Sequence, residues 1–216
     1  MRSRDRLAAL RGLYGIVTDE GPLPPIPWAR ALAAGGACAV QLRVKRLPAR
    51  EALSLARALR AALPETILVV NDRPDLALLS GADGVHVGEE DLSPVDARRV
   101  VGPGLLVGAT ARSAAAALAA LRGGADHLGV GPVFPSATKP IAGRPLGIPG
   151  LARICAAVRP APVVAISGID ASSAGAVAAA GAACAAVIGA VAASEDPAAA
   201  ARTLAAAFAR AGGVRS

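Results

Sequence analysis

The stretch SGADGVHVG, residues 80–88, joins a turn of small residues to a short run in which valine alternates with other residues. The same arrangement occurs in GGACAVQLR (35–43), GGADHLGVG (123–131) and AGAACAAVIG (180–189). Alternation of this kind is typical of a β-strand, and a Gly-rich turn is a common place for a helix to end. The chain is therefore predicted to repeat one supersecondary unit.

The spacing of these turns predicts the size of the unit. Their Gly-Ala pairs begin at positions 36, 81, 124 and 181, so the first two steps are 45 and 43 residues, about two strand–helix units each. The last step is 57 residues, and the excess lies in PVFPSATKPIAGRPLGIPG (132–150). That segment is too long and too rich in Pro and Gly for an ordinary connection, so we expect a functional loop there.

Strand candidates alternate with helical stretches such as 48–63 and 113–124, which predicts a parallel sheet. Eight units in this length favour one domain, residues 1–216, folded as a (β/α)8 TIM barrel with a short N-terminal helical extension. An open doubly wound sheet is the second choice, weakened because no GxGxxG follows the first strand. The eight strand candidates are 14–19, 38–43, 66–71, 84–88, 105–110, 127–133, 162–167 and 184–190.

Composition narrows the functional classes. The 216 residues are 54% hydrophobic with a mean hydropathy of +0.49, which excludes a disordered chain. The net charge is +7, yet aromatics are only 2%, so we expect anionic small molecules rather than nucleic acid as partners. No apolar run has the length of a membrane span. Three scattered cysteines without a CxxC motif favour the cytoplasm, and a homo-oligomer is compatible with the sequence.

Polar residues gather where the predicted strands end, which is where TIM barrels build their sites. Arg43, Lys45 and Lys139 suit phosphate, because arginine offers a planar fork and lysine a point charge. Asp72 and Asp91 are hard oxygen ligands of the kind that Mg²⁺ takes together with substrate phosphate. This set predicts a site for a diphosphate with Mg²⁺.

A second phosphate site is predicted across the barrel. Ser167-Gly168-Ile169 and Ile188-Gly189-Ala190 follow strands seven and eight, where backbone N–H groups commonly hold phosphate in this fold. The two regions together predict two phosphorylated substrates, one a diphosphate and one a monophosphate.

Simpler interpretations stand beside these. Asp72 and Asp91 each precede a proline that could open a helix, so each could be a helix N-cap. For Asp91 the helix-cap and metal-ligand interpretations are about evenly balanced. For Asp72 the metal-ligand interpretation is favoured, because Asn71 and Asp72 directly follow an apolar strand. Lys139 on its own could be a solvated loop charge. His86 and His127 are interpreted as packing residues.

Seven motifs in order carry a resemblance to a known family: VQLRVK, VNDRPDLAL, GADGVHVGEEDL, VGATARS, GVGPVFPSATKP, AISGI and AAVIGA. Together they resemble the thiamine phosphate synthase family, related to the thiazole tautomerases, from about Tyr14 to Pro197. The resemblance implies a (β/α)8 barrel that joins 4-amino-5-hydroxymethyl-2-methylpyrimidine diphosphate to a thiazole phosphate. The implied products are thiamine phosphate and pyrophosphate, formed by Mg²⁺-assisted departure of the diphosphate without a side-chain nucleophile.

The resemblance also implies roles for individual residues, with Arg43, Thr110 and Lys139 as the catalytic ones and Asp72 and Asp91 as the Mg²⁺ ligands. The residues implied for the pyrimidine diphosphate are Gln41, Arg43, Lys45, Asn71, Thr110 and Lys139, and those implied for the thiazole phosphate are Ser136, Thr138, Gly168, Ile188 and Gly189.

Four positions depart from the family pattern. Val44 replaces a usual carboxylate, and Arg112 stands where a histidine is frequent. Ser167 replaces a glycine and adds a side chain near the expected monophosphate, while Gly189 replaces a serine and keeps only the backbone N–H.

Two other functions are compatible with such a barrel. A thiazole tautomerase would lack the metal carboxylates and use the histidine that Arg112 replaces here. A non-catalytic phosphate-ligand binder is compatible with the departures, but an idle site would have no use for a desolvated charge cluster. Pyrophosphate release that requires Mg²⁺ distinguishes a synthase from both.

Overall fold

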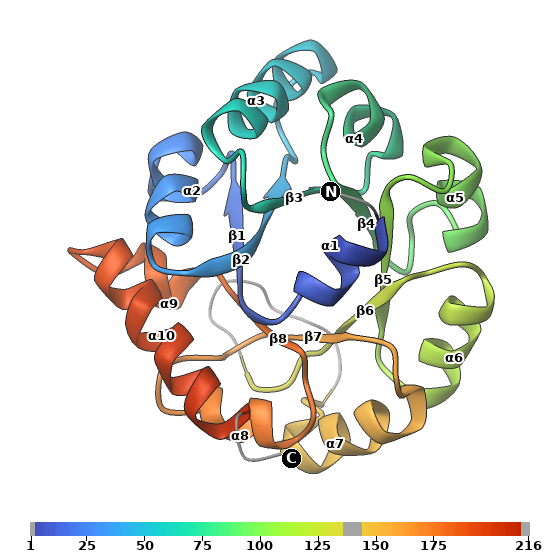
Figure 1. Ribbon diagram of the computed structural model, residues 1–216, viewed down its shortest axis with the longest axis vertical. Helices are drawn as coiled ribbons and strands as arrows, with labels where there is room; N and C mark the ends of the chain where they lie inside the picture. The colour runs from blue at the N-terminus through green and yellow to red at the C-terminus, as the bar shows by residue number, and fades with distance from the viewer. Residues whose placement is uncertain (1–2, 136–143, 213–216) are drawn as a thin grey trace.

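The computed structural model describes residues 3–135 and 144–212, and within them eight parallel strands close into a barrel in the order β1 to β8 (Figure 1). Each strand pairs with the next along the chain, and β1 pairs with β8. The predicted barrel and its N-terminal helix are confirmed. The strands are β1 Gly12–Thr18, β2 Ala37–Arg43, β3 Ile67–Asn71, β4 Gly84–Val87, β5 Leu106–Ala111, β6 His127–Val130, β7 Val163–Ile166 and β8 Cys184–Val187.

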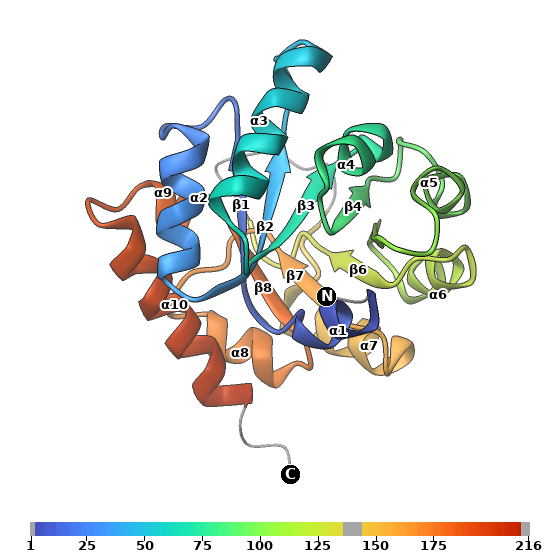
Figure 2. The ribbon, with the colours of Figure 1, turned by 45° about the horizontal axis from the view of Figure 1, so that its top comes forward.

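Helices surround the barrel, and one more lies across its opening. In Figure 1 α1 lies inside the ring that the other helices form, and in Figure 2 the strand arrows run away from α1, so this helix covers the end of the barrel where the strands begin. Leu10, just after α1, is fully buried there, and Arg6 of α1 donates to the carbonyl of Gly104 before β5. The helices are α1 Ser3–Ala9, α2 Pro25–Ala34, α3 Ala49–Ala62, α4 Pro74–Ser80, α5 Pro94–Val101, α6 Ala114–Arg122, α7 Gly147–Val158, α8 Ala174–Ala179, α9 Gly189–Ala192 and α10 Pro197–Gly212.

The repeated Gly-Ala turns have a common backbone geometry. Gly36, Gly81, Gly124 and Gly181 have φ angles of 88°, 72°, 94° and 101°. A side chain is disfavoured in this left-handed region, and glycine enters it at little cost. Each turn ends a helix and starts the next strand, which explains why the same two small residues recur through the sequence.

Apolar residues fill two layers because side chains alternate between the two faces of each strand. In β1, Leu13 and Val17 belong to the larger cluster between the sheet and the helices. Tyr14 and Ile16 belong to the smaller cluster inside the barrel. The inward-facing residues nearest the strand ends therefore line the space in which a barrel site forms.

Two aspartates in the repeated turns bind neighbouring strands together. Asp83 accepts a hydrogen bond from the Leu68 N–H at 2.9 Å and pairs with Arg60 at 2.5 Å and with Arg6 at 2.7 Å. Asp126 repeats the arrangement one turn further along the chain, with the Val107 N–H at 2.8 Å and Arg98 at 2.5 Å. These carboxylates lie where the strands begin, at the end of the barrel that stabilises the fold.

No helix within the described ranges combines the length and the apolar character that crossing a membrane would require.

Removing the Asp83 carboxylate should destabilise the barrel. Asp83→Ala leaves the partly buried Arg60 and the Leu68 N–H without their acceptor, so we expect the free energy of unfolding to fall by about 3 kcal/mol. Urea denaturation measures this change, with the exposed Glu65→Ala as a control that should stay within about 0.5 kcal/mol. Equal stability of the two variants would show that the Asp83 cluster does not hold the strands.

Candidate active site

A pocket of about 1220 Å³ opens at the end of the barrel where the strands finish. Every strand or the loop after it contributes to its wall. Of the residues predicted from the sequence, Ser136, Thr138 and Lys139 lie outside the described residues. The others all line the pocket: Gln41, Arg43, Lys45, Asn71, Asp72, Asp91, Thr110, Gly168, Ile188 and Gly189.

The end of β2 and the loop after it hold two of the predicted cations, and Asp19 anchors that loop. The Asp19 carboxylate accepts hydrogen bonds from the backbone N–H groups of Lys45, Arg46 and Leu47 at 2.8–3.2 Å. Burial acts to raise the pKa of Asp19, but these three donors outweigh it and the pKa lies below its ordinary value. The carboxylate therefore stays ionised and fixes the backbone from which the Lys45 side chain extends.

Asp72 and Asp91 meet on the neighbouring side of the pocket. Asp72 has a φ of 63°, an uncommon value for a residue with a side chain, and its N–H donates to the His86 carbonyl at 2.7 Å. Asp91 accepts from the Gly88 N–H at 2.8 Å. Desolvation and the neighbouring Asp72 carboxylate raise the pKa of Asp91, as expected of two like charges that share a site. Lys45 Nζ lies 2.5 Å from Asp72 Oδ2 and partly offsets their charge.

Neither aspartate is a helix cap. The N-cap of α4 is Arg73, without a side-chain capping bond, and the N-cap of α5 is Ser93, whose hydroxyl accepts from the Asp96 N–H. The capping interpretation is therefore wrong for both Asp72 and Asp91. Their carboxylates are directed to the pocket and to its rim instead.

The opposite wall is formed by the loops after β7 and β8. Gly168 has a φ of 66°, and a Cβ at this position would lie 2.3 Å from the Pro135 carbonyl oxygen. Only glycine fits where the two loops come this close. Ser167 has a φ of 87°, and its hydroxyl donates to the Phe134 carbonyl at 3.0 Å. The extra side chain at this departure from the family pattern thus ties one pocket loop to another.

The floor of the pocket brings Gln41 and Thr110, which the sequence marked as functional, together with Tyr14, His86 and His127, which it did not. Gln41 Nε2 donates to the Tyr14 hydroxyl at 3.0 Å, and His86 Nε2 lies 3.0 Å from Thr110 Oγ1. His127 joins them, with its ring centroid 6.1 Å from that of His86. Strand register supplies the missing signal, because Asn71, His86, Gly108 and His127 are consecutive cross-strand partners.

Burial keeps the floor uncharged. It raises the pKa of the Tyr14 hydroxyl, despite the hydrogen bond from Gln41. It lowers the pKa of His86 to about 4 and that of His127 to about 3. At neutral pH the pocket therefore has a charged rim over a neutral polar floor.

Of two further departures from the family pattern, Arg112 lines the pocket and Val44 does not. Val44 is partly buried against the outer core. Arg112 Nε lies 3.3 Å from Glu89 Oε2, and both residues line the pocket.

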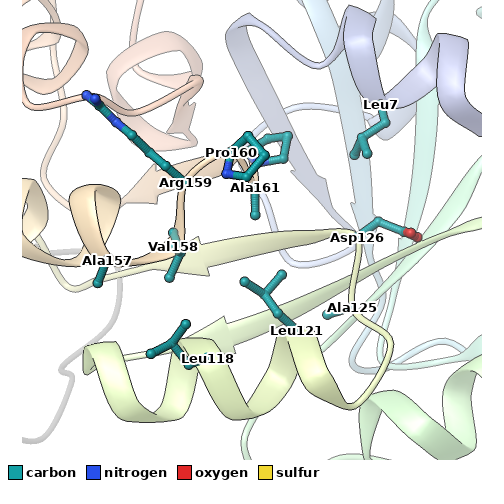
Figure 3. Close-up of a pocket in the computed structure, with 11 residues that line it drawn as sticks. Leu7, Leu118, Leu121, Ala125, Asp126, Ala157, Val158, Arg159, Pro160 and Ala161 are labelled. Carbon is teal, nitrogen blue, oxygen red and sulfur yellow. The ribbon is translucent and has the colours of Figure 1, made fainter.

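A second hollow, of about 420 Å³, lies at the opposite end of the barrel and is mostly apolar (Figure 3). Its charged lining residues are Asp126 and Arg159, whose side chains point away from each other in Figure 3. Asp126 is already bound to Arg98 and to the Val107 N–H. The large pocket is therefore the candidate active site, and the small hollow is not.

A (β/α)8 barrel whose strand ends present two carboxylates, cations and close-packed glycine loops belongs to the phosphate-handling barrels. Comparison with known proteins makes the class specific: residues 13–191 match the family described as thiamine monophosphate synthase. The chain belongs to this family, as the order of its motifs predicted.

Individual proteins that are similar to this chain support the same family assignment. The chain is 50% identical to the thiamine-phosphate synthase of Anaeromyxobacter dehalogenans, over 82% of this chain and 78% of that protein. It is 46% identical to the thiamine-phosphate synthase of Myxococcus xanthus, over 78% of each. The solved structure of thiamine phosphate pyrophosphorylase from Pyrococcus furiosus is similar with a TM-score of 0.86 at 37% identity, covering 95% of this chain and 98% of that one.

Removing the Asp19 carboxylate should weaken binding of a diphosphate without unfolding the barrel. Asp19→Ala frees three backbone N–H groups in the loop that carries Lys45, so we expect the affinity for inorganic pyrophosphate to fall about tenfold. Calorimetric titration measures it. Asp75→Ala, which removes an exposed carboxylate paired with Arg73, should bind pyrophosphate like the unchanged protein. Unaltered affinity in Asp19→Ala would refute the anchoring role.

The buried histidines should make stability depend on pH. The unfolded chain binds protons on His86 and His127 near their ordinary pKa of about 6.5, whereas the folded chain binds them only near 4 and 3. The free energy of unfolding should therefore fall as the pH drops below about 6.5, each histidine adding up to about 1.4 kcal/mol per pH unit. Urea denaturation at several pH values should show a shallower dependence for His127→Phe. Identical slopes would show that His127 takes up its proton at the same pKa in the folded and the unfolded chain.

Proposed function

We propose that this pocket condenses 4-amino-5-hydroxymethyl-2-methylpyrimidine diphosphate with a thiazole phosphate, releasing pyrophosphate and giving thiamine phosphate. The observation that carries the proposal is the Asp72–Asp91 pair with Lys45 at its edge, in a barrel of the thiamine monophosphate synthase family. Two carboxylates and a cation at one rim suit a diphosphate that arrives with a divalent metal.

The donor set fits Mg²⁺. The described residues contain no group of three or more histidine, cysteine or acidic side chains arranged to hold a metal ion. The Asp72–Asp91 pair is nevertheless what Mg²⁺ typically takes from a protein, since substrate phosphates and water complete its shell. The mutual repulsion that raises the pKa of Asp91 is an observation in the same direction, because a divalent cation would relieve it. A bound Mg²⁺ would offset charge on the leaving diphosphate.

The chain's own residues would position the pyrimidine diphosphate and stabilise the charge of the departing diphosphate. Arg43 and Lys45 would hold the diphosphate, and Asp19 would keep their loop in place. Asn71 and Thr110 line the wall between the charged rim and the floor, Gln41 lies on the floor beside Tyr14, and all three would orient the pyrimidine. Fixed charges that face a departing diphosphate stabilise the transition state without reorganisation.

The thiazole phosphate would bind across the pocket, against the loops after β7 and β8 that contain Gly168, Ile188 and Gly189. The thiazole nitrogen would then attack the pyrimidine methylene from a fixed position, so no side-chain nucleophile is required. Ser136 and Thr138 are proposed for this substrate, and Lys139 for the diphosphate. We also propose that the chain acts as one domain on these small phosphorylated substrates in the cytoplasm, with Arg43, Thr110 and Lys139 as its catalytic residues.

A thiazole tautomerase fits less well. That reaction is expected to use a histidine after β5, where this chain has Arg112 paired with Glu89. It also gives no role to the Asp72–Asp91 pair.

Pyrophosphate release tests the proposal directly. Both substrates are supplied together and singly, with Mg²⁺ and with a chelator in its place. Release that requires both substrates and the metal supports the synthase. Tight binding of both substrates by the folded protein without release would indicate a binder instead.

Removing one metal carboxylate should abolish turnover and spare the fold. Asp72→Asn keeps the shape and tolerates the left-handed backbone, but it removes the charge, so we expect kcat to fall by about 100-fold or more. Steady-state kinetics over a range of Mg²⁺ concentrations measures it, with circular dichroism to confirm folding. Glu90→Gln neutralises another carboxylate of the pocket rim and should lose less than about threefold. Equal losses in the two variants would argue against a metal role for Asp72.

A further inference from the structure

His127 is a buried polar side chain without a partner among the described residues. Its exposed fraction is 1%, and neither Nδ1 nor Nε2 has a hydrogen bond there. A neutral imidazole carries one donor and one acceptor, and leaving them unpaired in the interior costs folding free energy. Native proteins rarely keep such a group without a reason, so its surroundings indicate what it serves.

The surroundings are those of a pocket floor. His127 lines the large pocket together with Ile16, Val164 and Ala186. Gly108, the third residue of β5, makes room for the histidine rings, because a Cβ at this position would lie 2.3 Å from His127 Nε2 and 2.6 Å from His86 Nδ1. The imidazole thus lies in a closely packed niche of the floor, against the backbone of β5.

The niche lies beneath the substrate that the proposed function assigns to this side of the barrel. Strand register carries a continuous row from Asn71, in the proposed diphosphate set, through His86 and Gly108 to His127. A diphosphate held at the rim by Lys45 and Arg43 is joined to its heteroaromatic ring through one methylene, so the ring reaches inward from the rim. Thr110, which contacts His86, lies between the two levels.

His86 and His127 differ in what they have left to offer. His86 already uses Nε2 on the Thr110 hydroxyl. Gln41 and Tyr14, the other polar pair of the floor, bond to each other. Neither nitrogen of His127 is engaged by the described residues, and burial holds its pKa near 3, so the imidazole is uncharged at neutral pH.

We propose that His127 is a specificity-determining residue, which hydrogen-bonds the polar edge of the pyrimidine ring through one of its imidazole nitrogens. The proposal rests on the proposed function for the identity of the ring. An aromatic heterocycle with ring nitrogens and an exocyclic amino group offers both an acceptor and a donor to a neutral imidazole. A site built to hydrogen-bond a substrate group discriminates strongly against analogues that lack it.

A structural role predicts different behaviour. If His127 merely packs the barrel, phenylalanine fills the same space without burying unpaired nitrogens, and the variant is more stable at no cost in binding. If His127 hydrogen-bonds the pyrimidine ring, the same variant gains stability and loses affinity only for the ligand that contains this ring.

The experiment compares His127→Phe with the unchanged protein in three measurements, all with Mg²⁺ present. Thermal denaturation should give an equal or higher Tm. Calorimetric titration should give an affinity for the pyrimidine diphosphate that is about tenfold lower, because one hydrogen bond in a dry site is lost. The affinity for inorganic pyrophosphate, which lacks the ring, should change less than twofold. His127→Gln keeps a donor and an acceptor and should recover part of the loss.

Each other result overturns the proposal. Unchanged affinity for both ligands with a higher Tm would make His127 a tolerated packing residue. Equal loss for both ligands would mean that the substitution disturbs the whole pocket, and His127→Gln would then show whether polarity matters at all. The binding measurements do not depend on turnover. If His127→Phe loses affinity only for the pyrimidine diphosphate and the unchanged protein releases no pyrophosphate, the proposed reaction is refuted and the proposed role of His127 in binding is retained.

Discussion

The hydrogen bonds between β1 and β8 close the sheet, and the pocket exists because of that closure. Gly12 pairs with Cys184 and Gly15 with Val187, so the first and last strands become neighbours across most of the sequence. An open sheet would leave the β7 and β8 loops far from Arg43 and Lys45. Closure places the wall with Arg43 and Lys45 and the wall with Gly168 and Gly189 on opposite sides of one space, as the proposed reaction between two phosphorylated molecules would require.

The rim of the pocket is lined by ionised side chains, whereas the polar side chains of its floor are uncharged. At the rim, Asp19 binds the backbone of the loop that carries Lys45, and Lys45 pairs with Asp72, so the charged side chains are held in fixed positions. At the floor, burial suppresses ionisation of Tyr14, His86 and His127. A charged diphosphate is thereby favoured at the mouth, and a neutral ring is favoured below it.

The sequence predicted the fold well because the barrel depends on local signals. Alternating strands and left-handed glycines in the Gly-Ala turns are features that each unit carries on its own. The strand-end residues followed, since topology alone sends them to one rim. The role of Asp19 and the exclusion of Asp72 and Asp91 as helix caps depend on contacts between loops that no spacing encodes. The floor was missed because His127 begins its strand, and only barrel shear brings it level with His86.

Several costly features of this chain lie around the pocket. Asp72 and Ser167 adopt left-handed backbone in the pocket wall, and His127, which begins β6, buries two unpaired nitrogens at the pocket floor. At the other end Asp83 and Asp126 have their acceptor oxygens engaged by arginines and strand N–H groups. Strain and unpaired polarity persist only where the surrounding structure over-determines them. The end of the barrel that holds Asp83 and Asp126 thus supports the left-handed backbone of Asp72 and Ser167 at the other end, and His127 lies between the two ends, at the floor of the pocket.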